Sequence, residues 1–191
     1  MLSQQPTPAD LWLSTRLLMR RPALDDLPAL PDLPAGFSLR TYEPDDCLPL
    51  AKLLSRAFDE PWDEALVRVR LADAPDVAAI YLVVHERHLA ATASARMGTD
   101  EFPDAGYVHW VGADPDYQRR GLGRLVTLRV LHHFRAAGLQ SAVLETQVPR
   151  LAAQRTYLKL GFVPEYRDRE EQVRWSRLLP QHLRQGDSHD R

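Results

Sequence analysis

We expect a buried strand, a turn and the start of a long helix where the chain reads Val111-Gly112-Ala113-Asp114-Pro115-Asp116-Tyr117-Gln118-Arg119-Arg120-Gly121-Leu122-Gly123. The strand should occupy residues 107–113, which are almost wholly apolar, and Asp114 and Pro115 should end it. Apolar side chains recur at helical spacing over residues 121–137, and Gly138 is a typical helix stop.

The start of this helix has the properties of a phosphate-binding site. The first backbone N–H groups of a helix have no partner within it, and they form the positive end of its dipole. Gly121 and Gly123 would let a phosphate approach the backbone, and three arginines within residues 119–124 add positive charge. The dinucleotide fingerprint does not fit, because Val126 stands where its third glycine would be, and the Gly-Lys-Ser/Thr of a nucleotide-triphosphate loop is missing.

The remaining patterns predict strands and helices on either side of this stretch. Periods of two and of 3.6 residues place strands at 37–42, 79–84, 89–97, 141–147, 162–166 and 172–178, and helices at 45–58, 61–71 and 151–160. The order β-α-α-β-β-β-α-β-α-β-β describes an α/β protein with an α+β mixed sheet and helices on both faces. The last two strands are expected to form a hairpin.

Prolines set the start of the chain apart from the rest. Six prolines fall within residues 1–35, which we interpret as a Pro-rich N-terminal arm with one short helix at 10–19. This arm would either pack on the domain or be mobile. One domain is expected over residues 36–180, followed by a polar C-terminal tail at 181–191.

Composition restricts the function classes. The 191 residues carry a formal net charge of −2, whereas a nucleic-acid-binding protein needs a basic excess, so we expect no nucleic acid partner. No apolar run is long enough to span a bilayer and residues 1–10 lack a secretory signal, so we expect no membrane partner and a cytoplasmic location. Cys47 lies among leucines, which indicates packing, and the histidines lack metal-ligand spacing, so no metal is expected.

Two signatures together resemble a known family. The first is a strand ending in hydrophobic-x-Pro, followed by Gln/Arg-x-x-Gly-x-Gly and a long amphipathic helix, and the second, Ala-x-x-x-Tyr-x-x-x-Gly-Phe, matches residues 153–162. Both resemble the GCN5-related N-acetyltransferase (GNAT) superfamily, and the order of elements over residues 37–179 is similar to that family. The resemblance implies the GNAT acyl-CoA N-acyltransferase fold and acetyl-CoA as co-substrate. It also implies acetyl transfer to a primary amine by direct attack in a ternary complex.

The resemblance further implies where acetyl-CoA binds. The strands at 107–113 and 141–147 should separate and leave a cleft for the pantetheine arm, bordered by the backbone of Val111, Gly112 and Ala113. The pyrophosphate would lie against Gln118, Arg119, Arg120, Gly121, Leu122, Gly123 and Arg124. One position departs from the family, because Arg150 stands where an asparagine usually contacts the cofactor; Gln147 and Gln154 are candidates to replace it.

Two residues are candidate catalytic groups. By the second signature Tyr157 would protonate the departing thiolate, which a phenol with a pKa near 10 can do, or else it is an aromatic side chain packed in the core. His109 stands on the central strand where many relatives carry a glutamate base, and a histidine with a pKa near 6.5 could accept the ammonium proton. If His109 only bonds a neighbour, Glu145 or a solvent relay becomes the candidate base.

Two functions from different classes remain open. The first is an acetyltransferase that acts on a small-molecule or peptide amine. The second is a catalytically silent acyl-CoA-binding sensor or subunit with the same fold, which the arginine at position 150 favours. No motif identifies the acceptor, and the oligomeric state is left open, with a homodimer as one possibility.

Overall fold

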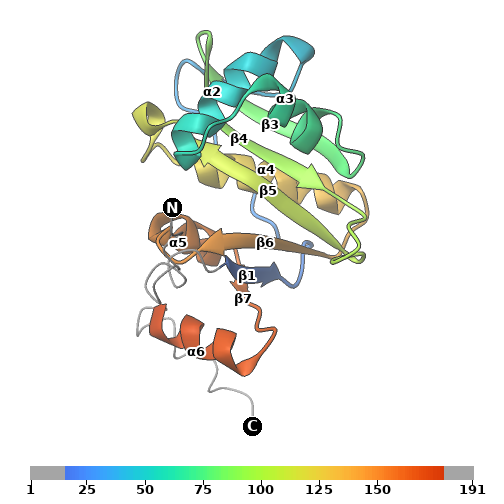
Figure 1. Cartoon of the computed structure of the whole chain (residues 1–191). Coiled ribbons are helices and arrows are strands. Elements are labelled where there is room, and N and C mark those ends of the chain that lie inside the picture. The colour runs from blue at the N-terminus through green and yellow to red at the C-terminus, as the bar shows by residue number, and fades with distance from the viewer. Residues whose placement is uncertain (1–15, 179–191) are drawn as a thin grey trace, which may run out of the picture.

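The computed structural model describes residues 16–178, which are built around a seven-stranded sheet (Figure 1). The strands are β1 (Arg16–Arg21), β2 (Phe37–Thr41), β3 (Val77–His85), β4 (His88–Arg96), β5 (Ala105–Ala113), β6 (Ser141–Gln147) and β7 (Val163–Pro164). They lie in the order β2-β3-β4-β5-β6-β1-β7, and all neighbours are antiparallel except β5 and β6, which are parallel. The predicted mixed sheet is confirmed.

Helices cover both faces of this sheet, as predicted. They are α2 (Cys47–Phe58), α3 (Glu64–Val67), α4 (Leu122–Ala136), α5 (Leu151–Lys159) and α6 (Arg169–Leu178), with a π turn, η2 (Arg68–Ala72), directly after α3. Strand β3 shows the two faces by its alternation, because Tyr81 and Val83 pack in the cluster that contains α4, whereas Ile80 and Leu82 pack with α2 and α3. Within this part of the chain, no helix combines the length and the apolar character that a membrane span requires.

The helix predicted at residues 10–19 is wrong over residues 16–19, because Arg16–Arg21 form strand β1. The rest of that prediction falls in residues 1–15, which lie outside the described range. Strand β1 lies between β6 and β7 and is antiparallel to both. Leu17 and Met19 pack in the cluster with α4, and Leu18 packs on the opposite face. Three consecutive apolar residues suit a strand that is covered on both faces. The described part of the N-terminal arm therefore packs on the domain, and the tail at 181–191 is outside the described range.

The strand expected at residues 172–178 is also wrong, because this segment belongs to helix α6. The Asp168 side chain accepts a hydrogen bond from the N–H of Glu171, and the Glu171 carboxylate accepts one from the N–H of Arg167. Asp168 thereby satisfies one orphan donor of the first turn, as an N-cap residue does, and Glu171 reaches back to the N–H of the residue before the cap. The short strand β7 pairs with β1, so the expected hairpin of the last two strands is absent.

Candidate active site

Strands β5 and β6 pair only over their first residues and then separate. The parallel pairs between these two strands run from Ala105 with Ser141 to Val108 with Leu144. Beyond Val108 and Leu144, β5 and β6 no longer pair with each other. A cavity of about 260 Å³ lies at this opening, lined by Arg16, Phe58, Glu60, Arg70, Tyr107, Val108, His109, Trp110, Val111, Glu145, Thr146, Gln147, Arg150 and Tyr157. A cleft is thus present between the two strands where one was expected.

A β-bulge in β5 accompanies the separation. Ser94 of β4 pairs with His109, and Thr92 pairs with Gly112, so β5 holds one more residue than β4 between these two pairs. Trp110, within the bulge, has a φ of 48°, a left-handed conformation that is rare for an aromatic residue. Because a bulge bends its strand and redirects side chains, it turns β5 away from β6 at this point.

The loop before α4 leaves the start of that helix open. Arg119 and Gly121 have φ values of 61° and 76°, and Gly121 is the N-cap residue. A Cβ atom added at Gly121 or Gly123 would meet no heavy atom within 4 Å. The first-turn N–H groups therefore border open space, and Gln118 and Arg119 of the preceding loop are exposed. The loop has both the room and the donors that a phosphate needs.

The other residues expected to surround the pyrophosphate lie in different environments. Leu122 is buried in the core, and Arg124 is half-buried. The Arg120 guanidinium lies 5.8 Å from the ring centroid of Phe37 and 6.0 Å from that of Tyr117. This loop therefore offers an anion chiefly the backbone N–H groups, with the arginine charges around them.

The end of β5 presents a free backbone edge to the cleft. Ala113 pairs with Ala91 of β4 and Gly112 with Thr92, while no strand of residues 16–178 pairs with the opposite edge beyond Val108. A Cβ atom at Gly112 would lie 3.1 Å from side-chain atoms of α2, so this glycine allows the close packing of that helix. The backbone at Val111 and Ala113 could therefore extend a ladder to an added strand-like ligand.

Tyr157 of α5 lies at the cleft as well as in the core. Its side chain is buried and lines the cavity, and its ring lies 6.0 Å from that of Phe162. Burial raises the pKa of Tyr157 to about 12, and the positive charge of Arg150 partly offsets this. The hydroxyl is therefore protonated at neutral pH, and it is a weaker acid than a free phenol.

His109 of β5 lines the same cavity. It is a weaker base than the sequence led us to expect. Its Nδ1 atom is buried and has no hydrogen-bond partner in residues 16–178. Burial, and then the charge of Arg96, lower the pKa of His109 to about 3. This pKa lies well below the value near 6.5 expected from the sequence, because the sequence could place neither the burial nor Arg96.

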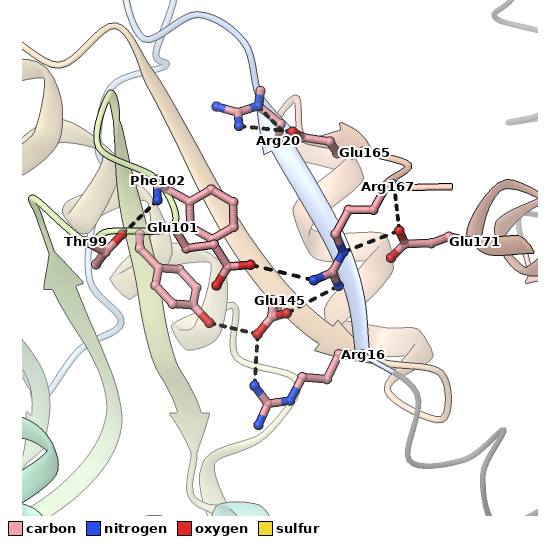
Figure 2. A network of polar contacts seen from close by, with 10 residues as sticks. Arg16, Arg20, Thr99, Glu101, Phe102, Glu145, Glu165, Arg167 and Glu171 are labelled. Atoms are coloured by element: carbon pink, nitrogen blue, oxygen red, sulfur yellow. Dashed lines mark hydrogen bonds and ion pairs between the residues drawn. The ribbon is translucent and has the colours of Figure 1, made fainter. Parts of the chain in front are cut away.

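Glu145 of β6 lies at the centre of a polar network beside the cavity, shown in Figure 2. Its carboxylate accepts hydrogen bonds of 3.1 Å from the Tyr107 hydroxyl and from Nη1 of Arg16. Nη2 of Arg167 lies 3.6 Å away on the other side, and Arg167 also pairs with Glu171 at 3.5 Å. Burial, and then the neighbouring Glu145 carboxylate, raise the pKa of Tyr107. Arg16 was missed as a site residue, because it was assigned to an arm outside the domain.

Arg150 occupies the N-cap position of α5 and lines the cleft. Its guanidinium lies 4.4 Å from the ring centroid of Phe58, and its Nε donates to Oε1 of Gln147 at 3.3 Å. Gln154 is buried, and its amide donates to the carbonyl oxygens of Gln147 and Val148 at 3.0 Å, so it supports the loop. Of the two candidate replacements for the asparagine, only Gln147 lines the cavity.

A second, larger cavity adjoins the first. It has a volume of about 800 Å³ and lies between η2 and the loop at residues 98–102. The two cavities share a wall made of Arg70, Tyr107, His109 and Trp110. Two ligands could thus meet at His109 from different sides.

Comparisons with known sequences agree with this geometry. The family model described as the acetyltransferase (GNAT) family matches residues 48–162. The chain is similar to the mycothiol acetyltransferase of Nocardia farcinica, with 37% identity over 174 residues that cover 85% of this chain and 55% of that protein. It is also similar to the mycothiol acetyltransferase of Thermobispora bispora, with 38% identity over 157 residues that cover 75% of this chain and 52% of that protein. The chain spans about half the length of these relatives.

Solved structures with the same fold come from several bacteria. The GCN5-related N-acetyltransferase of Sphaerobacter thermophilus superposes with a TM-score of 0.62 at 21% identity, over 78% of this chain and 48% of that chain. The ribosomal-protein-S18-alanine N-acetyltransferase of Escherichia coli gives a TM-score of 0.57 at 23% identity, over 68% of this chain and 79% of that chain. At these identities the likeness concerns the fold alone.

Proposed function

Because the chain belongs to the acetyltransferase (GNAT) family, we propose that it transfers the acetyl group of acetyl-CoA to a primary amine. The observation that carries this proposal is the opening between β5 and β6, which Tyr157 and His109 line from two sides. The pyrophosphate would bind at the open N-terminus of α4, and the pantetheine arm would follow the free edge of β5 at Val111 and Ala113. The acceptor amine is a small molecule or a peptide.

The reaction is a direct attack within a ternary complex. The amine nitrogen forms a bond to the acetyl carbon, and the bond from that carbon to sulfur breaks. The departing thiolate, whose pKa is about 8.5 on the cysteine scale, takes a proton from the Tyr157 hydroxyl. The pKa of about 12 keeps this hydroxyl protonated before the step. The attacking nitrogen releases a proton to solvent, and solvent returns a proton to the Tyr157 oxygen.

The proton of the acceptor ammonium leaves without His109 as the base. An alkyl ammonium has a pKa of about 10, so proton transfer to His109, whose pKa burial lowers well below its usual 6.5, is unfavourable. The amine therefore reacts after it has lost its proton to water, which the neighbouring Glu145 carboxylate can assist. His109 stays neutral, and its acceptor nitrogen can orient an N–H of the attacking amine.

The silent acyl-CoA-binding alternative gains no support from the site. It rested on the arginine at position 150, yet Arg150 and Gln147 both line the cleft and keep its wall polar. The candidate acid Tyr157 is placed at the same cavity.

A direct assay tests the proposal. The protein is mixed with acetyl-CoA and a panel of primary amines, and free thiol is followed over time. We expect thiol release that depends on both the amine and the protein. Binding of coenzyme A with no amine-dependent thiol release across a broad panel would instead support the silent alternative.

A further inference from the structure

The larger cavity is the one through which an acceptor can reach the shared wall. It is lined by η2 and by the loop at residues 98–102, and no residue of β6 lines it. A role for this cavity in acceptor binding rests on the proposed function, since the acceptor is the second substrate of the same site.

A π turn fixes one lip of this cavity. Helix α3 begins at Asp63, whose side chain accepts the N–H of Leu66 at 2.8 Å, and it widens into η2 at Arg68. Leu71 of the turn is buried, whereas Val69 and Arg70 are exposed and line the cavity. Because π turns inside helices often occur at functional sites, these two side chains are candidates for a role in binding.

Arg70 is held in place by an aromatic platform. Its guanidinium lies 5.6 Å from the ring centroid of Trp62, which is buried. The Trp62 ring in turn lies edge-on to Trp110, with centroids 4.6 Å apart at 84°. The cation is thereby connected, through two tryptophans, to the bulge of β5.

Arg70 has no carboxylate partner among residues 16–178. Salt bridges pair Arg96 with Asp76 and Arg16 with Glu145, but no carboxylate in this range lies within 4 Å of Arg70. The positive charge also acts on the reacting centre, since Arg70 is one of the charges that lower the pKa of His109. Asp76, Asp100 and Glu101 line the same cavity away from the shared wall, and Asp76 is paired with Arg96. At the shared wall itself, an anionic group of the acceptor would meet the positive charge of Arg70.

We propose that Arg70 binds an anionic oxygen group, a carboxylate or a phosphate, of the acceptor amine and thereby determines acceptor specificity. A guanidinium offers paired N–H donors that match the oxygens of both groups. The acceptor class is therefore an amine that carries its own negative charge.

Matched pairs of amines test this inference. Glycine is compared with glycinamide, and O-phosphoethanolamine with ethanolamine, with rates expressed per concentration of free amine. For the parent protein we expect kcat/KM to favour the anionic member of at least one pair by about 10- to 100-fold, the range for hydrogen bonds to charged groups. The pair that shows the preference distinguishes a carboxylate from a phosphate.

Two variants assign the preference to the residue. Arg70→Met keeps an unbranched side chain over Trp62 and should lose the preference, chiefly through a higher KM, while Arg70→Lys should recover part of it. Arg68→Met is the matched control, because Arg68 lies in the same turn, is exposed, and lines neither cavity. Its preference should equal that of the parent.

Each outcome decides the inference. Equal kcat/KM values for both members of both pairs, or an equal loss in Arg68→Met, would overturn it and leave the proposed function standing. If the parent acetylates no amine, the proposed function fails, and binding decides the inference. Tryptophan fluorescence is then titrated with glycine and with O-phosphoethanolamine while coenzyme A is present. Saturation in the parent and none in Arg70→Met supports the inference, and identical curves overturn it.

Discussion

The hydroxyl of Tyr107 donates a hydrogen bond of 3.1 Å to Glu145, across the point where β5 and β6 begin to part. Tyr107 lies opposite Val143, within the last paired residues of the two strands, and Glu145 follows beyond them. The hydrogen bond holds β5 and β6 together just before they separate, whereas the bulge at Trp110 turns β5 away from β6.

Removing that hydroxyl should weaken the fold. In Tyr107→Phe, Glu145 loses one donor and keeps Arg16, so we expect the free energy of unfolding to fall by about 1 kcal/mol. Urea unfolding at pH 7 measures this change. Tyr117→Phe serves as the control, because that hydroxyl has no hydrogen bond within residues 16–178, and an equal loss in both variants would contradict the prediction.

Tyr157→Phe should separate chemistry from binding. The ring stays packed against Phe162, while the proton donor to the thiolate disappears. We expect kcat to fall by about 10²-fold with the dissociation constant of acetyl-CoA nearly unchanged. Steady-state kinetics and calorimetric titration give the two values. A kcat equal to that of the parent would show that Tyr157 is a core residue only.

Gly123→Glu should abolish binding of coenzyme A. A side chain at this position points into open space, so the fold should tolerate it, yet its carboxylate would occupy the anion site before the helix. Coenzyme A should raise the Tm of the parent and leave that of the variant unchanged. Gly123→Gln, of similar size but without charge, should retain weak binding. Full binding by a folded Gly123→Glu protein would place the pyrophosphate elsewhere.

The pH dependence of kcat/KM should follow the acceptor amine. Because the pKa of His109 is about 3, the imidazole does not titrate above pH 5, and the rate should rise about tenfold per pH unit until the amine itself is neutral. His109→Ala should lower the rate by about 10-fold, through the loss of one hydrogen bond, without changing the shape of the profile. If kcat/KM of the parent instead levels off through a pKa between 6 and 7.5, and His109→Ala lacks this transition, His109 is the base.

The same residue should make the fold sensitive to acid. The unfolded chain binds a proton at His109 near pH 6.5, whereas the folded protein does so only near pH 3, so stability is complete above pH 6.5 and is lost as the pH falls. At pH 5 the loss from His109 should be about 2 kcal/mol relative to pH 7.5. Urea unfolding of His109→Gln at both pH values should show a correspondingly smaller difference, while His88→Gln, at an exposed position, should behave like the parent.

Local patterns predicted the elements whose identity depends on neighbouring residues. The turn at Asp114 and Pro115, the glycines at the start of α4, and the periodic helices lie where expected, as does Tyr157 at the cleft. Helix α6 has a local signal as well, since Asp168 and Glu171 have capping-box spacing, but the residues after it also fit a strand pattern.

Features that depend on distant contacts could not be predicted. Strand β1 forms because β6 offers it a partner, and Arg16 reaches Glu145 across a sequence separation of 129 residues. The pKa of His109 follows from burial and from Arg96, neither of which one sequence can locate. The left-handed residue of the bulge is Trp110 rather than a glycine, so no sequence pattern indicated it.

The position of β1 also sets an order of events during synthesis of the chain. Residues 16–21 leave the ribosome long before residues 141–147, with which they pair. Until then, the apolar side chains of Leu17, Leu18 and Met19 lack the neighbours that they have in the folded protein. Strand β7 then depends on β1, since β1 is its partner in the sheet. This edge of the sheet should therefore assemble late and slowly, because its contacts close the longest loops among residues 16–178.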